Sequence, residues 1–273
     1  MSAADRTRTV LSIAGSDSGG GAGVQADLKA FASVGVHGAT AITAVTAQNT
    51  LGVDAIHAVP PEIVVAQVRA VVSDIGVDAV KVGMLGDEAT ITAVAESLTL
   101  IGDVPVVVDP VMVSETGSEL LAADARGALI ATILPLATVL TPNLLEARNL
   151  AGLGEGASAE ELAGAIRALG PDAVIVTGGH ADGTDVLDDG GPEPMLAPGP
   201  LHPDGAAHGS GCTQSAALAA LLALGIDLRT ATFAARAIAA KAIGAGLRDV
   251  GAGPGPVDAL GIAAPTSART NSG

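Results

Sequence analysis

A turn of small residues directly before a long apolar helix is the strongest chemical signal in this sequence. The turn reads His208-Gly209-Ser210-Gly211-Cys212-Thr213. It leads into a helix predicted over residues 212–224, so several backbone N–H groups and the positive end of the helix dipole point at one place. We expect an anion to bind there, and we expect the same field to lower the pKa of the Cys212 thiol. A plain helix cap beside an inert, buried cysteine is the alternative.

A second glycine-rich stretch follows the first predicted strand. It reads Gly15-Ser16-Asp17-Ser18-Gly19-Gly20-Gly21-Ala22-Gly23. Such a loop exposes backbone N–H groups and lets a ligand approach closely. Residues 21–26 match the G-x-G-x-x-A pattern of dinucleotide-binding folds, but the next strand ends at residues 46–50 without the carboxylate that would hold a ribose. A dehydrogenase site and a simple tight turn are the alternatives here, and no P-loop motif is present.

Polar and acidic residues follow two further predicted strands. Asp109 comes directly after the strand over residues 104–108, and Asn143 and Glu146 come after the strand over residues 138–140. Ligands of open α/β sheets collect beyond the carboxyl ends of the strands, so we expect these three side chains to face one crevice. Carboxylates together with phosphate oxygens bind Mg²⁺. Alternatively, Asn143 caps a helix and Glu146 is its partner in a capping box.

The elements that would position these residues alternate along the chain. The predicted strands cover residues 10–14, 39–45, 79–82, 104–108, 138–140 and 173–176. The predicted helices cover residues 25–34, 61–74, 87–100, 119–134, 144–150, 159–169, 212–224 and 228–247. Because the strands are apolar throughout, we expect an α/β fold with a doubly wound, mostly parallel sheet flanked by helices. A small hairpin, residues 184–187 and 194–197, is predicted after the sixth strand.

Length and composition favour one folded domain. The chain has 273 residues, of which 49% are hydrophobic and 15% charged, and no linker, repeat or charge block divides it. We expect a domain over residues 9–262, with flexible tails at 1–8 and 263–273.

Charge and cysteine content exclude several classes of function. A formal net charge of −16 argues against binding to nucleic acid or to anionic membranes. The apolar runs are shorter than the roughly 20 residues that span a bilayer, and no signal-peptide core is recognisable. Cys212 is the single cysteine, which excludes an intramolecular disulfide and multi-cysteine metal sites. A cytoplasmic location is therefore predicted.

Seven segments, taken in order, resemble the hydroxymethylpyrimidine/phosphomethylpyrimidine kinase family of the ribokinase-like superfamily. They are residues 13–17 with 20–29, 47–50, 81–85, 109–112, 141–143, 178–180 and 208–213. The resemblance implies a ribokinase-like fold and an ATP- and Mg²⁺-dependent kinase of thiamine biosynthesis. Its substrates would be 4-amino-5-hydroxymethyl-2-methylpyrimidine and the monophosphate of that compound. A pyridoxal or pyridoxine kinase is the second enzymatic interpretation.

The same resemblance implies roles for individual residues. The residues that would line the aminopyrimidine pocket are Gly15, Asp27, Gln48, Met84 and Val111. The residues that would contact the nucleotide are Asn143, Thr177 and Gly179. The residues that would hold Mg²⁺ are Asp109 and Glu146. The residues that would form the anion hole are Gly209, Ser210 and Gly211, with Cys212 as the base. Met84 and Val111 would sandwich the ring, which suits a chain without Trp or Tyr.

One residue departs from the family pattern. Thr177 stands where the family commonly has a lysine before Gly-Gly-His, so a hydroxyl replaces a positive charge. Lys241 on the last predicted helix is one candidate for a compensating cation. The departure also leaves open a non-catalytic homologue that binds a pyrimidine or a nucleotide. The oligomeric state is open as well, with a homodimer as one candidate.

Overall fold

One nine-stranded sheet runs through the part of the chain that the computed structural model describes, residues 6–113, 117, 120–122, 124–178, 183–203 and 205–263. The strands are β1 (Thr9–Ser16), β2 (His37–Asn49), β3 (Gly52–Ala58), β4 (Ala79–Val82), β5 (Val106–Val108), β6 (Val139–Leu140), β7 (Ala173–Val176), β8 (Thr184–Asp188) and β9 (Met195–Pro198). Their order is β3-β2-β1-β4-β5-β6-β7-β8-β9. All pairs from β2 to β7 are parallel, and the edge pairs are antiparallel. The mostly parallel sheet is thus confirmed.

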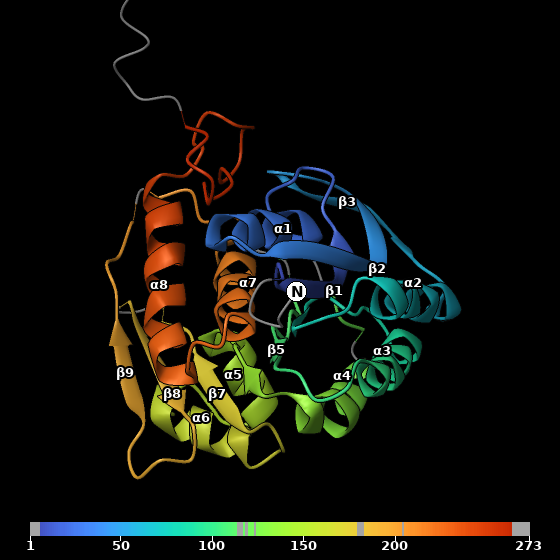
Figure 1. Ribbon diagram of the computed structural model, residues 1–273. Coiled ribbons are helices and arrows are strands. Elements are labelled where there is room, and N and C mark those ends of the chain that lie inside the picture. The colour runs from blue at the N-terminus through green and yellow to red at the C-terminus, as the bar shows by residue number, and fades with distance from the viewer. Residues whose placement is uncertain are drawn as a thin grey trace, which may run out of the picture.

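Helices cover both faces of the sheet (Figure 1). The helices on one face are α1 (Gly23–Val34), α7 (Ser210–Ala223) and α8 (Leu228–Gly244). The helices on the other face are α2 (Pro61–Asp74), α3 (Glu88–Ile101), α4 (Ala125–Ala128), α5 (Leu144–Ala151) and α6 (Ala159–Arg167). Each face has its own apolar core, so the central strands are buried on both sides, as their continuous apolar sequence requires.

The structure differs from the prediction at two elements, each for a local reason. The strand β3 was not predicted, because its seven residues are exposed or half-buried and show no core-facing pattern. The helix predicted over residues 119–134 is wrong: α4 has four residues and continues as one π-helical turn, Leu129–Ile133, and one 3₁₀ turn, Leu134–Leu136. Pro135 lies in that last turn, where its missing N–H favours the end of a helix. The predicted hairpin after the sixth predicted strand is confirmed as β8 and β9.

The ends of the predicted domain are described only in part. Arg6 and Arg8 form ion pairs with Asp78, at 2.5 and 2.8 Å. Residues 1–5 and 264–273, which make up most of the two predicted tails, lie outside the described residues.

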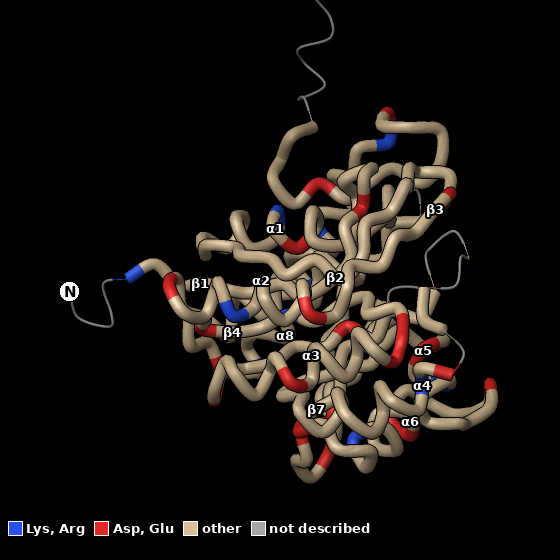
Figure 2. The backbone as a smooth tube through the Cα atoms, turned by 90° about the vertical axis from the view of Figure 1, so that its right-hand side faces the viewer, with Lys and Arg blue, Asp and Glu red and all other residues tan. Residues whose placement is uncertain are grey.

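Acidic residues are spread over the molecule. Figure 2 shows Asp and Glu on many elements of the visible side, with few Lys and Arg among them. An anionic ligand therefore has to be held by local groups rather than by the overall charge. No helix in the described ranges is long and apolar enough to cross a membrane.

The two phenylalanines of the chain provide a matched test of the core. Phe31 on α1 is fully buried, whereas Phe233 on α8 is 46% exposed. We expect Phe31→Ala to lower the free energy of unfolding by about 3–5 kcal/mol. Phe233→Ala should change the free energy of unfolding by no more than about 0.5 kcal/mol. Urea unfolding followed by far-UV circular dichroism measures both, and equal losses would contradict this core assignment.

Candidate active site

One cavity of about 330 Å³ opens where the carboxyl ends of the parallel strands meet the N-terminus of α7. This is the edge at which ligands of open α/β sheets bind. Most of the residues predicted for the site line this cavity, namely Gly15, Gln48, Met84, Asp109, Val111, Asn143, Glu146, Thr177, Gly209, Ser210, Gly211 and Cys212. Residues from seven separate segments are thus brought together by the topology of the sheet.

Two predicted site residues are not part of this lining. Asp27 is fully buried on α1, where its carboxylate accepts a hydrogen bond from Ser12 and pairs with Lys81. The side chain faces a buried cation rather than the cavity, and the predicted contact between Asp27 and the aminopyrimidine stays a prediction. Gly179 lies outside the described residues.

A buried charge cluster forms the floor of the cavity. Lys81 on β4 is fully buried, and its Nζ lies 3.0 Å from Asp27 Oδ1 and 3.8 Å from Asp109 Oδ2. Burial acts against the charged ammonium, but the attraction of the two carboxylates outweighs it and raises the pKa of Lys81. One positive charge thus stands between two carboxylates, and Asp109 also reaches the cavity.

The thiol of Cys212 lies directly above this cluster. It is hydrogen-bonded to Asp109 and to the backbone N–H of Gly23. Burial raises the pKa of the thiol to about 12; Lys81 opposes this shift, while the Asp109 and Asp27 carboxylates add to it. The predicted lowering of this pKa is therefore wrong. The field of the helix N-terminus is weaker than the combined effect of desolvation and two nearby negative charges.

Asn143 and Glu146 meet as a capping box at the start of α5. The backbone N–H of Glu146 donates to Asn143 Oδ1 at 2.9 Å, and that of Asn143 donates to Glu146 Oε2 at 2.9 Å. The capping alternative is therefore confirmed as a contact. Glu146 also faces Asp109: burial and the Asp109 charge raise the pKa of Glu146 to about 8, against hydrogen bonds from the backbone of Asn143 and Met112.

The surroundings of Thr177 contain a cation that the sequence did not single out. Lys241 is exposed and is not among the residues that line the cavity, so it does not replace the expected lysine. Arg236, five residues earlier on α8, is buried, lines the cavity and lies 3.5 Å from Asp185. The carboxylate of Asp185 also accepts the N–H of Gly178. The only signal for Arg236 was a charged residue on the apolar face of an Ala-rich helix.

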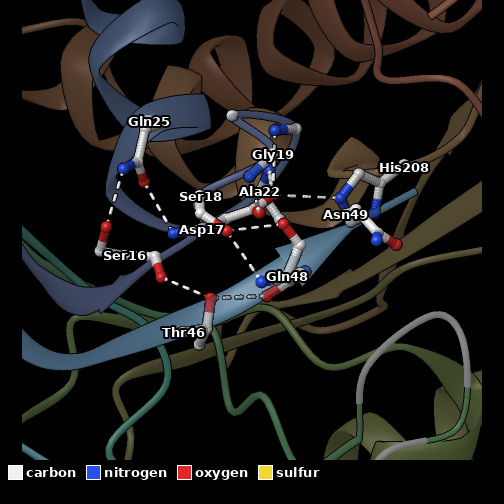
Figure 3. Close-up of polar contacts among 12 residues, drawn as sticks. Ser16, Asp17, Ser18, Gly19, Ala22, Gln25, Thr46, Gln48, Asn49 and His208 are labelled. Carbon is white, nitrogen blue, oxygen red and sulfur yellow. Dashed lines mark hydrogen bonds and ion pairs between the residues drawn. The ribbon is translucent and has the colours of Figure 1, made fainter. Parts of the chain in front are cut away.

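The opposite end of the cavity suits a planar ring. A Cβ atom built on Gly15 would lie 3.0 Å from Met84 Cε, so the glycine gives the Met84 side chain room to lie across the pocket. Thr46 donates a hydrogen bond to Gln48 Oε1 at 3.2 Å (Figure 3). The Gln48 amide nitrogen has no partner among the described residues, so it is able to donate to a ligand.

Two residues in the quoted motifs were given no role from sequence, yet they line the cavity. Asp17, in the glycine-rich loop, and His208, before α7, are 191 residues apart in sequence. In the structure His208 Nε2 lies 3.2 Å from Asp17 Oδ2 (Figure 3). The sequence contained both residues but no signal for their contact.

A mostly parallel α/β sheet, a helix N-terminus suited to an anion and carboxylates at the strand ends are the arrangement expected of the ribokinase-like class. The sequence model of the family described as phosphomethylpyrimidine kinase matches residues 17–258. The chain belongs to this family.

Individual relatives agree with the family assignment. The hydroxymethylpyrimidine/phosphomethylpyrimidine kinase of Rhizobium meliloti is 50% identical over 258 residues, which cover 92% of this chain and 96% of the relative. The crystal structure of phosphomethylpyrimidine kinase from Clostridium difficile 630 is 38% identical, with a TM-score of 0.74 and coverage of 84% and 96%. Pyridoxal kinase from Staphylococcus aureus, solved in complex with ADP, is 37% identical, with a TM-score of 0.84 and coverage of 93% and 94%.

The high pKa of Cys212 predicts slow alkylation of this single thiol. A shift from 9.0 to about 12 lowers the thiolate fraction near neutral pH by about a thousandfold, and the thiolate is the reactive form. Labelling with iodoacetamide, followed by mass spectrometry, should be slow in the folded protein and fast in urea. Rapid labelling of the folded protein, with a midpoint below pH 8, would contradict this assignment.

Proposed function

We propose that this chain transfers the γ-phosphoryl group of ATP to the hydroxymethyl group of 4-amino-5-hydroxymethyl-2-methylpyrimidine, and then to the monophosphate to give the diphosphate. The observation that carries this proposal is a single cavity that joins the Gln48 and Met84 pocket to the turn at residues 209–212. The name of the relative from Rhizobium meliloti supports the same activity, and the structural neighbour solved with ADP, a pyridoxal kinase, supports the use of a nucleotide. Reaction at this site would depend on positioning and charge stabilisation.

The turn before α7 would receive the migrating phosphoryl group. The backbone N–H groups of Gly209 and Gly211 are at the N-terminus of a helix of 14 residues, where an anion is stabilised, whereas the N–H of Ser210 donates to the carbonyl oxygen of Ala207 at 2.9 Å. Cys212 is proposed to take the proton of the acceptor hydroxyl. Burial, together with the Asp109 and Asp27 charges, raises the pKa of the thiol to about 12, so it is protonated in the free protein. To act as the base, Cys212 would first have to lose this proton to solvent, and neutralisation of the Asp109 charge on ligand binding would favour that loss.

Asp109 and Glu146 fit a Mg²⁺ ion. They are two buried carboxylates that repel each other, and a divalent cation between them would relieve that repulsion. In the described part of the chain no group of three or more His, Cys, Asp or Glu side chains could hold a metal ion, so phosphate oxygens and water would complete the coordination. The ion would neutralise charge on the transferring phosphoryl group.

The comparisons favour the pyrimidine over pyridoxal as substrate. Relatives at 44% to 50% identity carry the pyrimidine kinase name, whereas pyridoxal kinases enter as structural neighbours at 35% to 37%. Thr177 favours a non-catalytic homologue because the positive charge of the family's lysine is missing. Arg236, a buried cation in the same cavity lining, supplies a positive charge and so argues against that alternative.

The purified chain should convert the pyrimidine alcohol to its monophosphate and then its diphosphate, with ADP formed in step. Products are resolved by mass after incubation with Mg-ATP. We expect kcat/KM for the pyrimidine to exceed kcat/KM for pyridoxal measured side by side. The reverse order would favour a pyridoxal kinase, and tight ligand binding without ADP formation would favour a non-catalytic protein.

The metal role of Glu146 predicts a pH-dependent Mg²⁺ requirement. A carboxylic acid must lose its proton to bind the ion, and the pKa of Glu146 is about 8, so Mg²⁺ affinity should rise as pH increases toward 8. Below that pH the change should approach about tenfold per pH unit. Mg²⁺ titrations of the kinase rate at several pH values measure this slope.

Glu146→Gln should raise the Mg²⁺ requirement and remove the slope. Glu161→Gln is the matched control, because Glu161 holds the same capping-box position on α6 but is exposed and outside the cavity lining. If both variants behave alike, Glu146 has only the capping role.

Three further statements about this chain are proposals. Residues 9–262 would form the kinase domain. The single cysteine and acidic composition support a cytoplasmic location. A homodimer is the oligomeric state that sedimentation of the purified chain would test.

A further inference from the structure

The carboxylate of Asp17 is the centre of a hydrogen-bond network in the glycine-rich loop. It is 2% exposed, and both of its oxygens are used. Oδ1 accepts the N–H of Gly19 at 2.7 Å, and Oδ2 accepts the N–H groups of Gly21 and Ala22 at 2.9 and 2.8 Å. The ring of His208 adds a fourth contact from the other turn, at 3.2 Å (Figure 3). One side chain thus connects the loop to the residue that precedes the anion hole.

The backbones of the loop and the turn also touch. Gly209 has φ of 82°, and a Cβ atom built on it would lie 1.8 Å from the carbonyl oxygen of Gly21. A Cβ atom on Gly21 would lie 2.1 Å from the His208 ring. Only glycine allows this approach at both positions. The backbone N–H of Gly23 then reaches the Cys212 thiol.

The His208 backbone is held from a third direction. Its N–H donates to the carbonyl oxygen of Gly255 at 3.3 Å, and its carbonyl oxygen accepts the N–H of Val257 at 3.1 Å. The His208 ring therefore extends toward Asp17 from a backbone that is held in place by two hydrogen bonds. The contact requires a proton on Nε2 if Asp17 is ionised.

Asp17 is ionised at neutral pH in this arrangement. Burial acts to raise its pKa, but hydrogen bonds from His208, Ala22 and Gly19 together outweigh burial and hold the pKa below its usual value. Of the other charged groups, Lys29 donates to the carbonyl oxygen of Gly20 within the same loop. The loop is thus ordered around one carboxylate whose partner is His208.

We propose that Asp17 and His208 are a positioning pair for phosphoryl transfer, which holds the turn at residues 209–212 and the Cys212 thiol in register with the glycine-rich loop. This inference rests on the proposed function. The pair acts through the turn and does not need to touch the reacting atoms. Its loss should therefore lower kcat more than it raises the KM for the pyrimidine, whose pocket residues Gln48 and Met84 lie on other segments.

Steady-state kinetics of His208 variants test the pair. His208→Ala should lower kcat by about 100-fold, because small displacements of a reacting geometry have effects of that size, with the KM for the pyrimidine changed by less than about threefold. His37→Ala is the control, because His37 is exposed and lies at the amino end of β2, whereas the cavity lies at the carboxyl ends of the parallel strands. This variant should keep the rate of the unchanged protein. A His208→Ala protein that is folded and keeps more than half of kcat would overturn the proposal.

Conservative variants separate positioning from stability. The amide nitrogen of Gln extends to about the place of the histidine Nε2 and donates a hydrogen bond, whereas Asn is shorter. We expect His208→Gln to recover most of kcat and His208→Asn to stay impaired, at similar melting temperatures. Equal kcat values for His208→Gln and His208→Asn would contradict the proposed positioning role, even if the alanine variant fails to fold.

Thiol labelling tests the same contact without substrate. Cys212 is the single cysteine, so its iodoacetamide rate reports on the turn alone. His208→Ala and His208→Asn should label at least about tenfold faster than the unchanged protein, since a loosened turn opens more often. If the variants label faster but the unchanged protein shows no kinase activity, the proposed function is contradicted and the positioning pair is supported. If the unchanged protein is an active kinase and the variants label at its rate, the positioning pair alone is contradicted.

Discussion

The buried ion pair between Lys81 and Asp27 is the interaction on which the site depends. It joins β4 to α1 beneath the cavity, and neither side chain is exposed to solvent. Removing one member of such a pair leaves an uncompensated charge in the core, which typically costs about 3–5 kcal/mol. Because Asp109 and Cys212 lie close to the pair, their positions and charges are tied to it.

The two ends of the cavity differ in their charge. The α7 end presents backbone N–H groups, while the Asp109 and Glu146 end carries more negative charge than Lys81 balances. Burial and then the Asp109 charge raise the pKa of Glu146, and burial together with the Asp109 and Asp27 charges keeps the Cys212 thiol protonated. Backbone N–H donors and buried carboxylates thus lie at different ends of one cavity, in a chain with a net charge of −16.

Contacts between distant segments complete this arrangement. The glycine-rich loop after β1 and the turn before α7 touch through their backbones and through Asp17 and His208. Glycine at residues 21 and 209 is required by that closeness rather than by flexibility. The glycine-rich loop and the turn, two separate glycine-rich stretches in the sequence, thus lie side by side along one cavity.

The sequence alone determined the apolar strands, the polar residues at their carboxyl ends and the family, because periodicity and motif order are local properties of the chain. It did not show β3, which has no buried face, or the irregular backbone around Pro135. The inward direction of Asp27, the cation at Arg236 and the high pKa of Cys212 were decided by tertiary structure alone. Each depends on the distance between groups far apart in sequence, and burial and charge act through that distance.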